Sequence, residues 1–317
     1  MTDPDVAVLR QKIHGLPVER YADLLRERLP DREVVLARTP AEEADLVADA
    51  EIATGFTLDA DRVESAASLR LFACAFAGTD HLPLSAFETA DVAVTNASGV
   101  HGPNVAEYAV GAMLSFAQGF RRAWRQQERH EWRAFGAGEL AGSTVTVVGM
   151  GAIGRATARR LRPFDVEVLG VRHSPEKGAP EGVETAFGYD DVHDPVSRSE
   201  YVVLACPLTE TTDGLVDDDL LLSLPATGVV VNVARGPVVD TDALVGALRR
   251  NDLRGAALDV TDPEPLPADH PLWGFDDVSI TPHNAGHTPQ YYERLADIVA
   301  DNVRRLDRGE EIRNRVV

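Results

Sequence analysis

The chain has 317 residues, enough for two domains of ordinary size, and its 51 acidic residues outweigh 31 basic ones to give a formal charge of −20. This charge repels nucleic-acid phosphates and excludes nucleic acid as a partner. Only two of the basic residues are lysines, Lys12 and Lys177. Acid excess with lysine depletion favours a salt-adapted, halophilic protein, because at molar salt a Debye length of about 3 Å screens the self-repulsion. A merely acidic cytosolic enzyme is the alternative.

The sequence shows no pattern typical of a signal peptide or of a membrane span. The N-terminal segment MTDPDVAVLRQ lacks the basic and apolar regions of a signal peptide, and no apolar run approaches the length of a membrane span. Cys74 and Cys206 are too few for a disulfide framework, and each ends an apolar run, so we expect both in the core. The sequence therefore predicts a cytoplasmic protein without a membrane partner.

Strand-like and helix-like segments alternate along the whole chain, which predicts parallel sheets with crossover helices. The first series has strands near 6–9, 33–37, 51–54, 70–75 and 92–95, with helices near 18–28, 41–49 and 59–67. A long apolar helix over 104–120, continuing irregularly to 135, is either a core helix or an interdomain or dimer-forming element. The second series has strands near 144–148, 166–171, 201–205, 228–232, 255–259 and 278–281, with helices near 152–162, 217–224 and 240–250 and a last helix over 289–306.

The second series opens with a dinucleotide-binding pattern. A β-branched strand runs into GMGAIG (149–154), and apolar residues at helical spacing follow. In a G-x-G-x-x-G turn the first glycine permits the turn, the second lets the backbone approach a pyrophosphate, and the third lets helix and strand pack closely. Eighteen residues later Arg172, followed by His173 and Ser174, stands where an Asp or Glu would bind the ribose of NAD. A guanidinium there favours the 2′-phosphate of NADP.

Three later strands end in reactive side chains, and open α/β sheets bind ligands at the carboxyl ends of their strands. Arg235 follows the predicted strand near 228–232 and suits a carboxylate through two parallel hydrogen bonds. Glu264 lies in a proline-rich loop after the next strand. His283 follows the last strand and can exchange a proton near neutral pH, with Glu264 as the carboxylate that stabilises its cation. His287, four residues further on, is the rival histidine.

Five motifs in order make the sequence resemble the D-isomer-specific 2-hydroxyacid dehydrogenases. They are GMGAIG (149–154), CPLTETT (206–212), NVARG (232–236), LDVTDPEPLP (258–267) and TPHNAGHT (281–288), within roughly 75–317. The resemblance implies an α/β protein with two doubly wound parallel-sheet domains. One is a flavodoxin-like substrate domain, discontinuous over 1–100 plus 282–317, and the other is a Rossmann dinucleotide-binding domain over 101–281. It also suggests a homodimer built around 104–135.

The resemblance implies that Arg235, Glu264 and His283 are catalytic. Substrate contacts are expected from Ala77, Gly78, Arg235 and His283, with the loop 76–80 holding the substrate carboxylate through backbone N–H groups. Cofactor contacts are expected from Gly149, Gly151, Ala152, Ile153, Gly154, Arg172, His173, Ser174, Cys206, Pro207, Thr212, Val233, Ala234, Asp259 and Asn104. No metal site is expected. Two positions depart from the family pattern: Arg172 replaces the usual Asp, and Asn284 stands where an aliphatic residue is common.

These residues predict reduction of a small 2-oxoacid, with NADP(H) preferred and NAD(H) as the alternative cofactor, and the resemblance implies that the product is the D-2-hydroxyacid. His283 would give its proton to the carbonyl oxygen while Arg235 binds the carboxylate and stabilises the charge that develops. A glyoxylate or hydroxypyruvate reductase is the alternative within the family, and 3-phosphoglycerate dehydrogenase is disfavoured because no regulatory domain follows residue 317. A non-catalytic NAD(P)-sensing protein is the alternative of another class, because a fold alone does not determine function.

Overall fold

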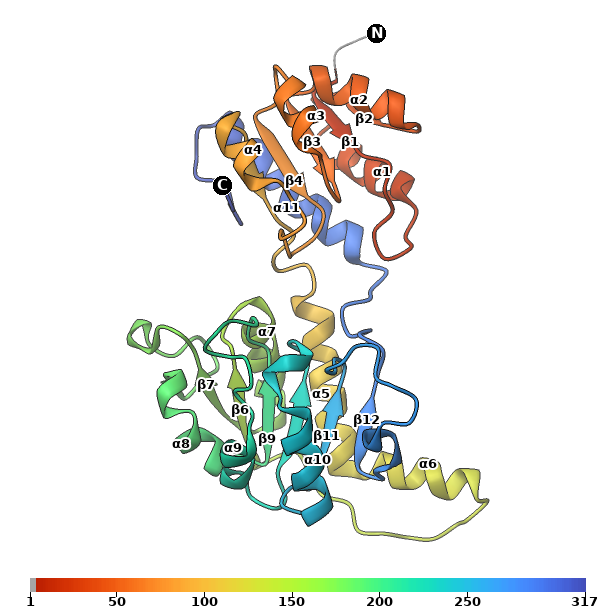
Figure 1. Ribbon diagram of the computed structural model, residues 1–317, viewed down its shortest axis with the longest axis vertical. Coiled ribbons are helices and arrows are strands. Elements are labelled where there is room, and N and C mark those ends of the chain that lie inside the picture. Colours follow the sequence, from red (N-terminus) through yellow and green to blue (C-terminus); the bar gives the residue numbers. More distant parts are fainter. Residues whose placement is uncertain (1–3) are drawn as a thin grey trace. The chain divides into compact units, whose positions relative to one another are not determined.

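The structure is a computed structural model that describes residues 4–317; the first three residues of the N-terminal segment lie outside the described residues. The chain forms two compact units, Met1–Val100 with His287–Val317 and His101–Gly286 (Figure 1). The chain therefore passes back to the first unit between residues 286 and 287, and not between 281 and 282. The reason is that the intervening residues are bonded within the second unit: Asn104 Nδ2 donates to the Ala285 carbonyl, and His101 Nδ1 is 2.9 Å from the Gly286 carbonyl oxygen.

The first unit is a parallel five-stranded sheet in the order β2-β1-β3-β4-β5 (Figure 1). Its strands are β1 (Val6–Val8), β2 (Val34–Leu36), β3 (Ile52–Gly55), β4 (Leu71–Cys74) and β5 (Ala93–Thr95), and its helices are α1 (Val18–Arg28), α2 (Pro40–Asp49), α3 (Ala60–Ser65), α4 (Leu84–Thr89) and α11 (Tyr291–Asp307). Successive strand residues point to opposite faces. Val6 and Val8 therefore pack with α1 and α11, whereas Ala7 packs with the helices α2 and α3.

The second unit is a parallel seven-stranded sheet in the order β12-β11-β10-β9-β6-β7-β8. Its strands are β6 (Thr144–Val148), β7 (Glu167–Val171), β8 (Thr185–Phe187), β9 (Tyr201–Leu204), β10 (Val229–Asn232), β11 (Gly255–Leu258) and β12 (Val278–Ile280). Its α-helices are α5 (Gly102–Gln118), α6 (Phe120–Glu128), α7 (Ala152–Leu161), α8 (His193–Ser197), α9 (Asp218–Ser223) and α10 (Thr241–Arg250). Single 3-10 turns are η1 (Arg162–Phe164), η2 (Pro175–Lys177), η3 (Tyr189–Asp191), η4 (Gly236–Val238) and η5 (Pro271–Gly274).

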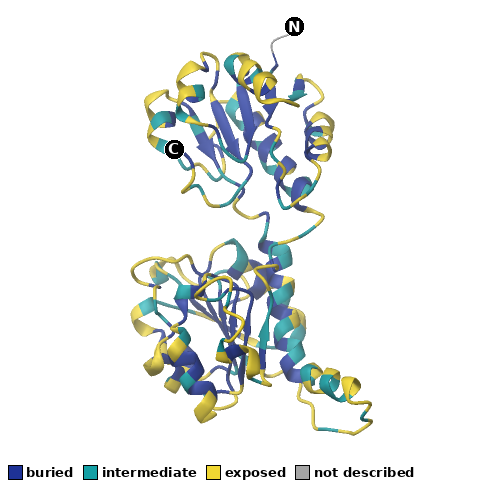
Figure 2. Cartoon of the chain, turned by 45° about the vertical axis from the view of Figure 1, so that its right-hand side comes forward, coloured by how far each residue is buried: buried dark blue, intermediate teal, exposed yellow. Residues whose placement is uncertain are grey.

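Both faces of this second sheet are covered. Val147 of β6 packs with α5 and α7, and the next residue, Val148, packs with α8, α9 and α10 on the opposite face. Figure 2 accordingly shows most of the strand residues in both units as buried. The two strand orders confirm the predicted class of two doubly wound parallel sheets, one flavodoxin-like and one Rossmann with a seventh strand.

The elements differ from the prediction in a few places. The strand β8 and the helices α4 and α8 were not predicted, because each has only three to six residues and too short an apolar pattern to reveal its period. The long helix is interrupted at Gly119, whose left-handed φ of +67° separates α5 from α6. Over residues 4–317 no helix combines the length and the apolar composition that crossing a bilayer requires.

Candidate active site

Three neighbouring strands carry the expected catalytic side chains. β10, β11 and β12 pair in parallel, so their carboxyl ends lie at one edge of the sheet. Arg235 follows β10, Glu264 lies in the loop after β11, and His283 follows β12. Ligands of open α/β sheets bind at this edge, so the fold presents all three side chains where a substrate would lie.

His283 and Glu264 form a hydrogen-bonded pair. The imidazole Nδ1 lies 2.8 Å from Glu264 Oε1, and the side chains remain 49% and 43% exposed. Because an ionised carboxylate only accepts, Nδ1 donates to it and Nε2 is the ring nitrogen left for a substrate. His283 has a left-handed φ of +53°, which is uncommon for a residue with a side chain.

Asp259 holds the loop that carries His283. Its carboxylate is buried and accepts three hydrogen bonds: Oδ1 from Thr281 Oγ1 (2.6 Å) and the Asn284 N–H (2.8 Å), and Oδ2 from the Ala285 N–H (2.9 Å). The His283 N–H donates to the Asp259 carbonyl (2.8 Å). These bonds offset the cost of burying the charge and fix the backbone on both sides of the imidazole.

Arg235 is exposed, and its guanidinium donates to the neighbouring Ala234 carbonyl (2.7 Å). Asn232 braces the turn, accepting from the Ala234 N–H and donating to the Arg235 carbonyl, each at 3.0 Å. The next residue, Gly236, is buried against the Glu264 loop: a Cβ there would lie 2.0 Å from the Thr261 carbonyl oxygen. Only glycine lets the Arg235 turn pack this closely on the loop of Glu264.

A cavity of about 550 Å³ adjoins the His283–Glu264 pair. Apolar side chains that the sequence did not suggest form much of its wall, among them Leu266, Trp273 and Ile280. The Trp273 indole N–H donates to the Pro267 carbonyl (2.8 Å), which ties the Glu264 loop to η5. The sequence signal that could have pointed to Trp273 is a tryptophan followed by glycine after a proline-rich segment. Nothing in the sequence, however, places this tryptophan beside His283.

The glycine turn fits a dinucleotide pyrophosphate. A Cβ at Gly149, whose φ is +99°, would lie 2.6 Å from the Ala205 backbone, and a Cβ at Gly154 would lie 1.9 Å from the Gly149 carbonyl oxygen. At Gly151 a Cβ would meet nothing within 4 Å, so the backbone there borders open space at the N-terminus of α7. Space at the second glycine and close packing at the other two match the requirements of the motif.

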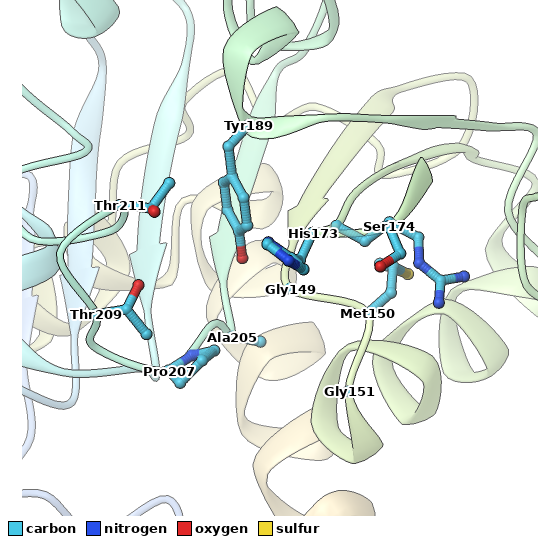
Figure 3. Close-up of a pocket in the computed structure, with 11 residues that line it drawn as sticks. Gly149, Met150, Gly151, His173, Ser174, Tyr189, Ala205, Pro207, Thr209 and Thr211 are labelled. Carbon is cyan, nitrogen blue, oxygen red and sulfur yellow. The ribbon is translucent and has the colours of Figure 1, made fainter. Parts of the chain in front are cut away.

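A second cavity, of about 480 Å³, opens beside this turn (Figure 3). Of the expected cofactor residues, it brings together Gly149, Gly151, Arg172, His173, Ser174 and Pro207. Arg172 is half-buried and donates to the Gly178 carbonyl (3.1 Å), and the described residues include no carboxylate paired with it. Sequence reasoning missed Met150, Tyr189, Ala205, Thr209 and Thr211, which complete the lining.

The other expected cofactor residues lie apart from that lining. Cys206, Val233 and Ala234 are buried. The Thr212 hydroxyl donates to the Pro207 carbonyl (2.6 Å) and braces the loop instead of facing the cavity. Ala152 and Ile153 form the first turn of α7. Asn104 and Asp259 are engaged with the segment 284–285, as described above.

The expected substrate loop belongs to the first unit. Ala77 and Gly78 follow β4, and Asn96 Nδ2 donates to the Ala77 carbonyl (2.8 Å). Gly78 is exposed, and a Cβ there would meet nothing within 4 Å. The backbone at Gly78 therefore borders open space within its own unit.

The cysteines do not offer a nucleophile. Both are buried, and burial raises the pKa of the Cys74 thiol and raises the pKa of Cys206 to about 11. Each thiol therefore stays protonated near neutral pH. Within the described part of the chain no group of three or more His, Cys, Asp or Glu side chains is arranged to hold a metal ion.

Comparison with known proteins points to one family. The model of the NAD-binding domain of D-isomer-specific 2-hydroxyacid dehydrogenases matches residues 110–285. A glyoxylate reductase of Thermofilum pendens is 35% identical over 259 residues, covering 80% of this chain and 76% of that protein. A D-3-phosphoglycerate dehydrogenase of Methanocaldococcus jannaschii is 31% identical over 94% of this chain, which spans only 57% of that relative. The crystal structure of a D-isomer-specific 2-hydroxyacid dehydrogenase from Xanthobacter autotrophicus, in complex with NADPH and MES, has a TM-score of 0.81 and 29% identity and covers 99% of this chain and 98% of its own.

Proposed function

The chain belongs to the D-isomer-specific 2-hydroxyacid dehydrogenase family, whose members are NAD(P)-dependent oxidoreductases, and we propose that it reduces a small 2-oxoacid to the D-2-hydroxyacid with His283 as proton donor. The observation that carries this proposal is the His283–Glu264 pair at 2.8 Å on the same sheet edge as an exposed Arg235. Acid, supporting carboxylate and carboxylate-binding cation are the three groups that the reaction needs.

The residues have separate tasks in this proposal. Arg235 binds the substrate carboxylate through its guanidinium and orients the keto group. His283, protonated on both nitrogens, gives the Nε2 proton to the carbonyl oxygen, while Glu264 accepts from Nδ1 and stabilises the imidazolium. Asp259 keeps the imidazole in place through its bonds to the loop. When bound, the nicotinamide cofactor supplies the hydride that the keto carbon receives.

We also propose that NADP(H) is preferred over NAD(H). Arg172 follows β7, beside Gly149 and Gly151, at the place where the ribose of the adenosine half would lie. The described residues that line this cavity include no carboxylate to accept from ribose hydroxyls, whereas Arg172 and Ser174, both in the lining, can donate to a phosphate. Cation and hydroxyl at this point favour the cofactor that carries the 2′-phosphate.

One assay tests the reaction and the cofactor preference. Oxidation of NADPH and of NADH is followed in molar salt with glyoxylate, pyruvate, hydroxypyruvate and branched 2-oxoacids. We expect turnover with a marked NADPH preference, and a D-configured product by chiral analysis. Turnover that favours NADH would support the proposed reduction but contradict the NADP(H) preference that we infer from Arg172. Tight cofactor binding without turnover of any acid would contradict the proposal and favour the NAD(P)-sensing alternative.

Glyoxylate or hydroxypyruvate is the second candidate substrate. The similarity to the glyoxylate reductase of Thermofilum pendens favours it over larger 2-oxoacids. In the same assay, the highest kcat/KM with these two acids would select the narrower activity.

We further propose a homodimer through residues 104–135 in a cytoplasmic, salt-adapted protein. In support, α6 has no buried residue, and Trp124 and Trp132 of this region are exposed although both are large and apolar. Exposed apolar patches of this kind mark interaction surfaces. Sedimentation equilibrium in molar salt measures the mass, and a monomer there would contradict the dimer.

A further inference from the structure

Tyr189 lines the cavity of about 480 Å³ beside the glycine turn, here called the cofactor cavity. It belongs to an element that the sequence did not predict. It is the first residue of η3, directly after the edge strand β8 and Gly188. β8 pairs with β7 with Val171 opposite Phe187, and the Arg172 N–H donates to the Phe187 carbonyl (2.9 Å). Tyr189 therefore follows the strand that pairs with β7, beside the turn that carries Arg172.

The Tyr189 side chain is directed into the cavity (Figure 3). It lies between His173 on one side and the loop with Pro207 and Thr211 on the other. The ring is half-buried, and among residues 4–317 its hydroxyl has no hydrogen-bond partner. Burial, with a smaller contribution from Cys206, raises the pKa of Tyr189 to about 12, so the phenol stays neutral beside an anionic cofactor.

The parts of the cavity differ in chemistry. Gly149 and Gly151 contribute backbone, which suits a pyrophosphate, and Arg172 with Ser174 contributes hydrogen-bond donors, which suit a phosphate on the ribose. The remaining wall includes the hydroxyl-bearing Thr209 and Thr211 together with the aromatic face of Tyr189 and the ring of Pro207, and the flat apolar surfaces of Tyr189 and Pro207 suit a heteroaromatic base.

We propose that Tyr189 binds the adenine of the cofactor through its ring. This inference rests on the proposed function, because it presupposes a dinucleotide in the cavity beside Gly149. Tyr189 then contributes equally to NAD(H) and NADP(H), whereas Arg172 supplies the difference between them. Tyr189 therefore contributes to the affinity for either cofactor, and Arg172 determines the choice between them. The two residues follow the neighbouring strands β8 and β7.

Calorimetric titration with 5′-ADP and 2′,5′-ADP tests this division without any turnover. For Tyr189→Ala we expect both fragments to bind about 5- to 150-fold more weakly and by the same factor, since stacking of a base on an aromatic ring is worth about 1–3 kcal/mol. Tyr189→Phe keeps the ring and should bind both fragments within about threefold of the unmodified protein. Arg172→Ala is the matched control and should weaken 2′,5′-ADP alone.

Three results would overturn the proposal. They are a Tyr189→Ala variant that binds both fragments normally, one that loses only 2′,5′-ADP, and a Tyr189→Phe variant that loses as much as Tyr189→Ala. Thermal melting of each variant detects a folding defect, and Tyr189→Phe decides the matter if the alanine variant does not fold. Failure of the proposed function looks different: the unmodified protein would then bind the fragments but reduce no 2-oxoacid.

Discussion

The imidazole of His283 is positioned from two directions. Glu264 engages Nδ1 at 2.8 Å, and the buried Asp259 engages the backbone on both sides of the residue. His287, the rival histidine, belongs to the first unit and lies against the ring of His14, with 4.8 Å between the ring centroids. The proposed reaction therefore assigns the proton transfer to His283 and the stabilisation of its cation to Glu264.

Substitutions at this pair should separate the two roles. His283→Ala removes the acid, and we expect kcat to fall about 10²- to 10⁴-fold while cofactor binding stays nearly unchanged. Glu264→Gln keeps the shape but removes the charge that stabilises the imidazolium. The pH at which 2-oxoacid reduction is half-lost should therefore move to lower pH, because reduction needs the protonated imidazole.

The neighbouring Asp262→Asn is the matched control for Glu264→Gln, because Asp262 lies in the same loop and its carboxylate forms no ion pair among the described residues. Its pH–rate profile should coincide with that of the unmodified enzyme. A Glu264→Gln profile that also coincides with it would contradict the assigned role.

At the scale of elements, the site depends on how closely the loops at the sheet edge approach one another. The Arg235 turn and the Glu264 loop meet where Gly236 contacts the Thr261 carbonyl, and Thr241 Oγ1 donates to the Asp262 carbonyl (2.9 Å). Patterning along the chain predicted most strands and helices, because their apolar faces repeat with the proper period. It did not predict β8, which places Tyr189, since three edge residues show no period.

Gly236→Ala should separate these two loops. The added Cβ would lie 2.0 Å from the Thr261 carbonyl oxygen, so backbone has to move, and we expect a loss of about 1–3 kcal/mol in the free energy of unfolding together with lower kcat. Gly246→Ala in α10 is the control, because its Cβ would meet only the end of the Arg250 side chain and alanine favours a helix. Denaturant titration measures both variants. Equal stability of Gly236→Ala and the unmodified protein would refute the packing argument.

At the scale of the molecule, the charge of −20 opposes the compact state in dilute buffer. Arginines offset it locally: Arg28 pairs with Glu293 (2.8 Å) and Asp297 (2.5 Å), which joins α1 to the C-terminal helix α11. Arg28 and Glu293 are half-buried and Asp297 is exposed, and ion pairs that reach solvent in this way are individually weak, so we expect the summed repulsion to dominate.

The melting temperature should therefore rise with salt. We expect most of the rise between millimolar salt and about 0.5 M KCl, where screening changes most. Differential scanning calorimetry measures it, and an uncharged osmolyte at matched osmolality separates screening from solvent exclusion. A melting temperature that falls as KCl is added would show that the ion pairs outweigh the repulsion and would contradict salt adaptation.

The sequence by itself determined the class of fold and the glycine turn, and it supplied the proposed acid His283, the proposed supporting carboxylate Glu264 and the proposed carboxylate-binding Arg235, because motifs and periods are local properties of a chain. Only the tertiary structure decided which residues adjoin them. Asp259 binds the backbone near His283 from a different strand, Gly236 meets Thr261 across two loops, and Tyr189 reaches the cofactor cavity from β8. The physical reason is that such contacts join residues distant in sequence, and they exist only once parallel strands have brought their carboxyl ends to one edge.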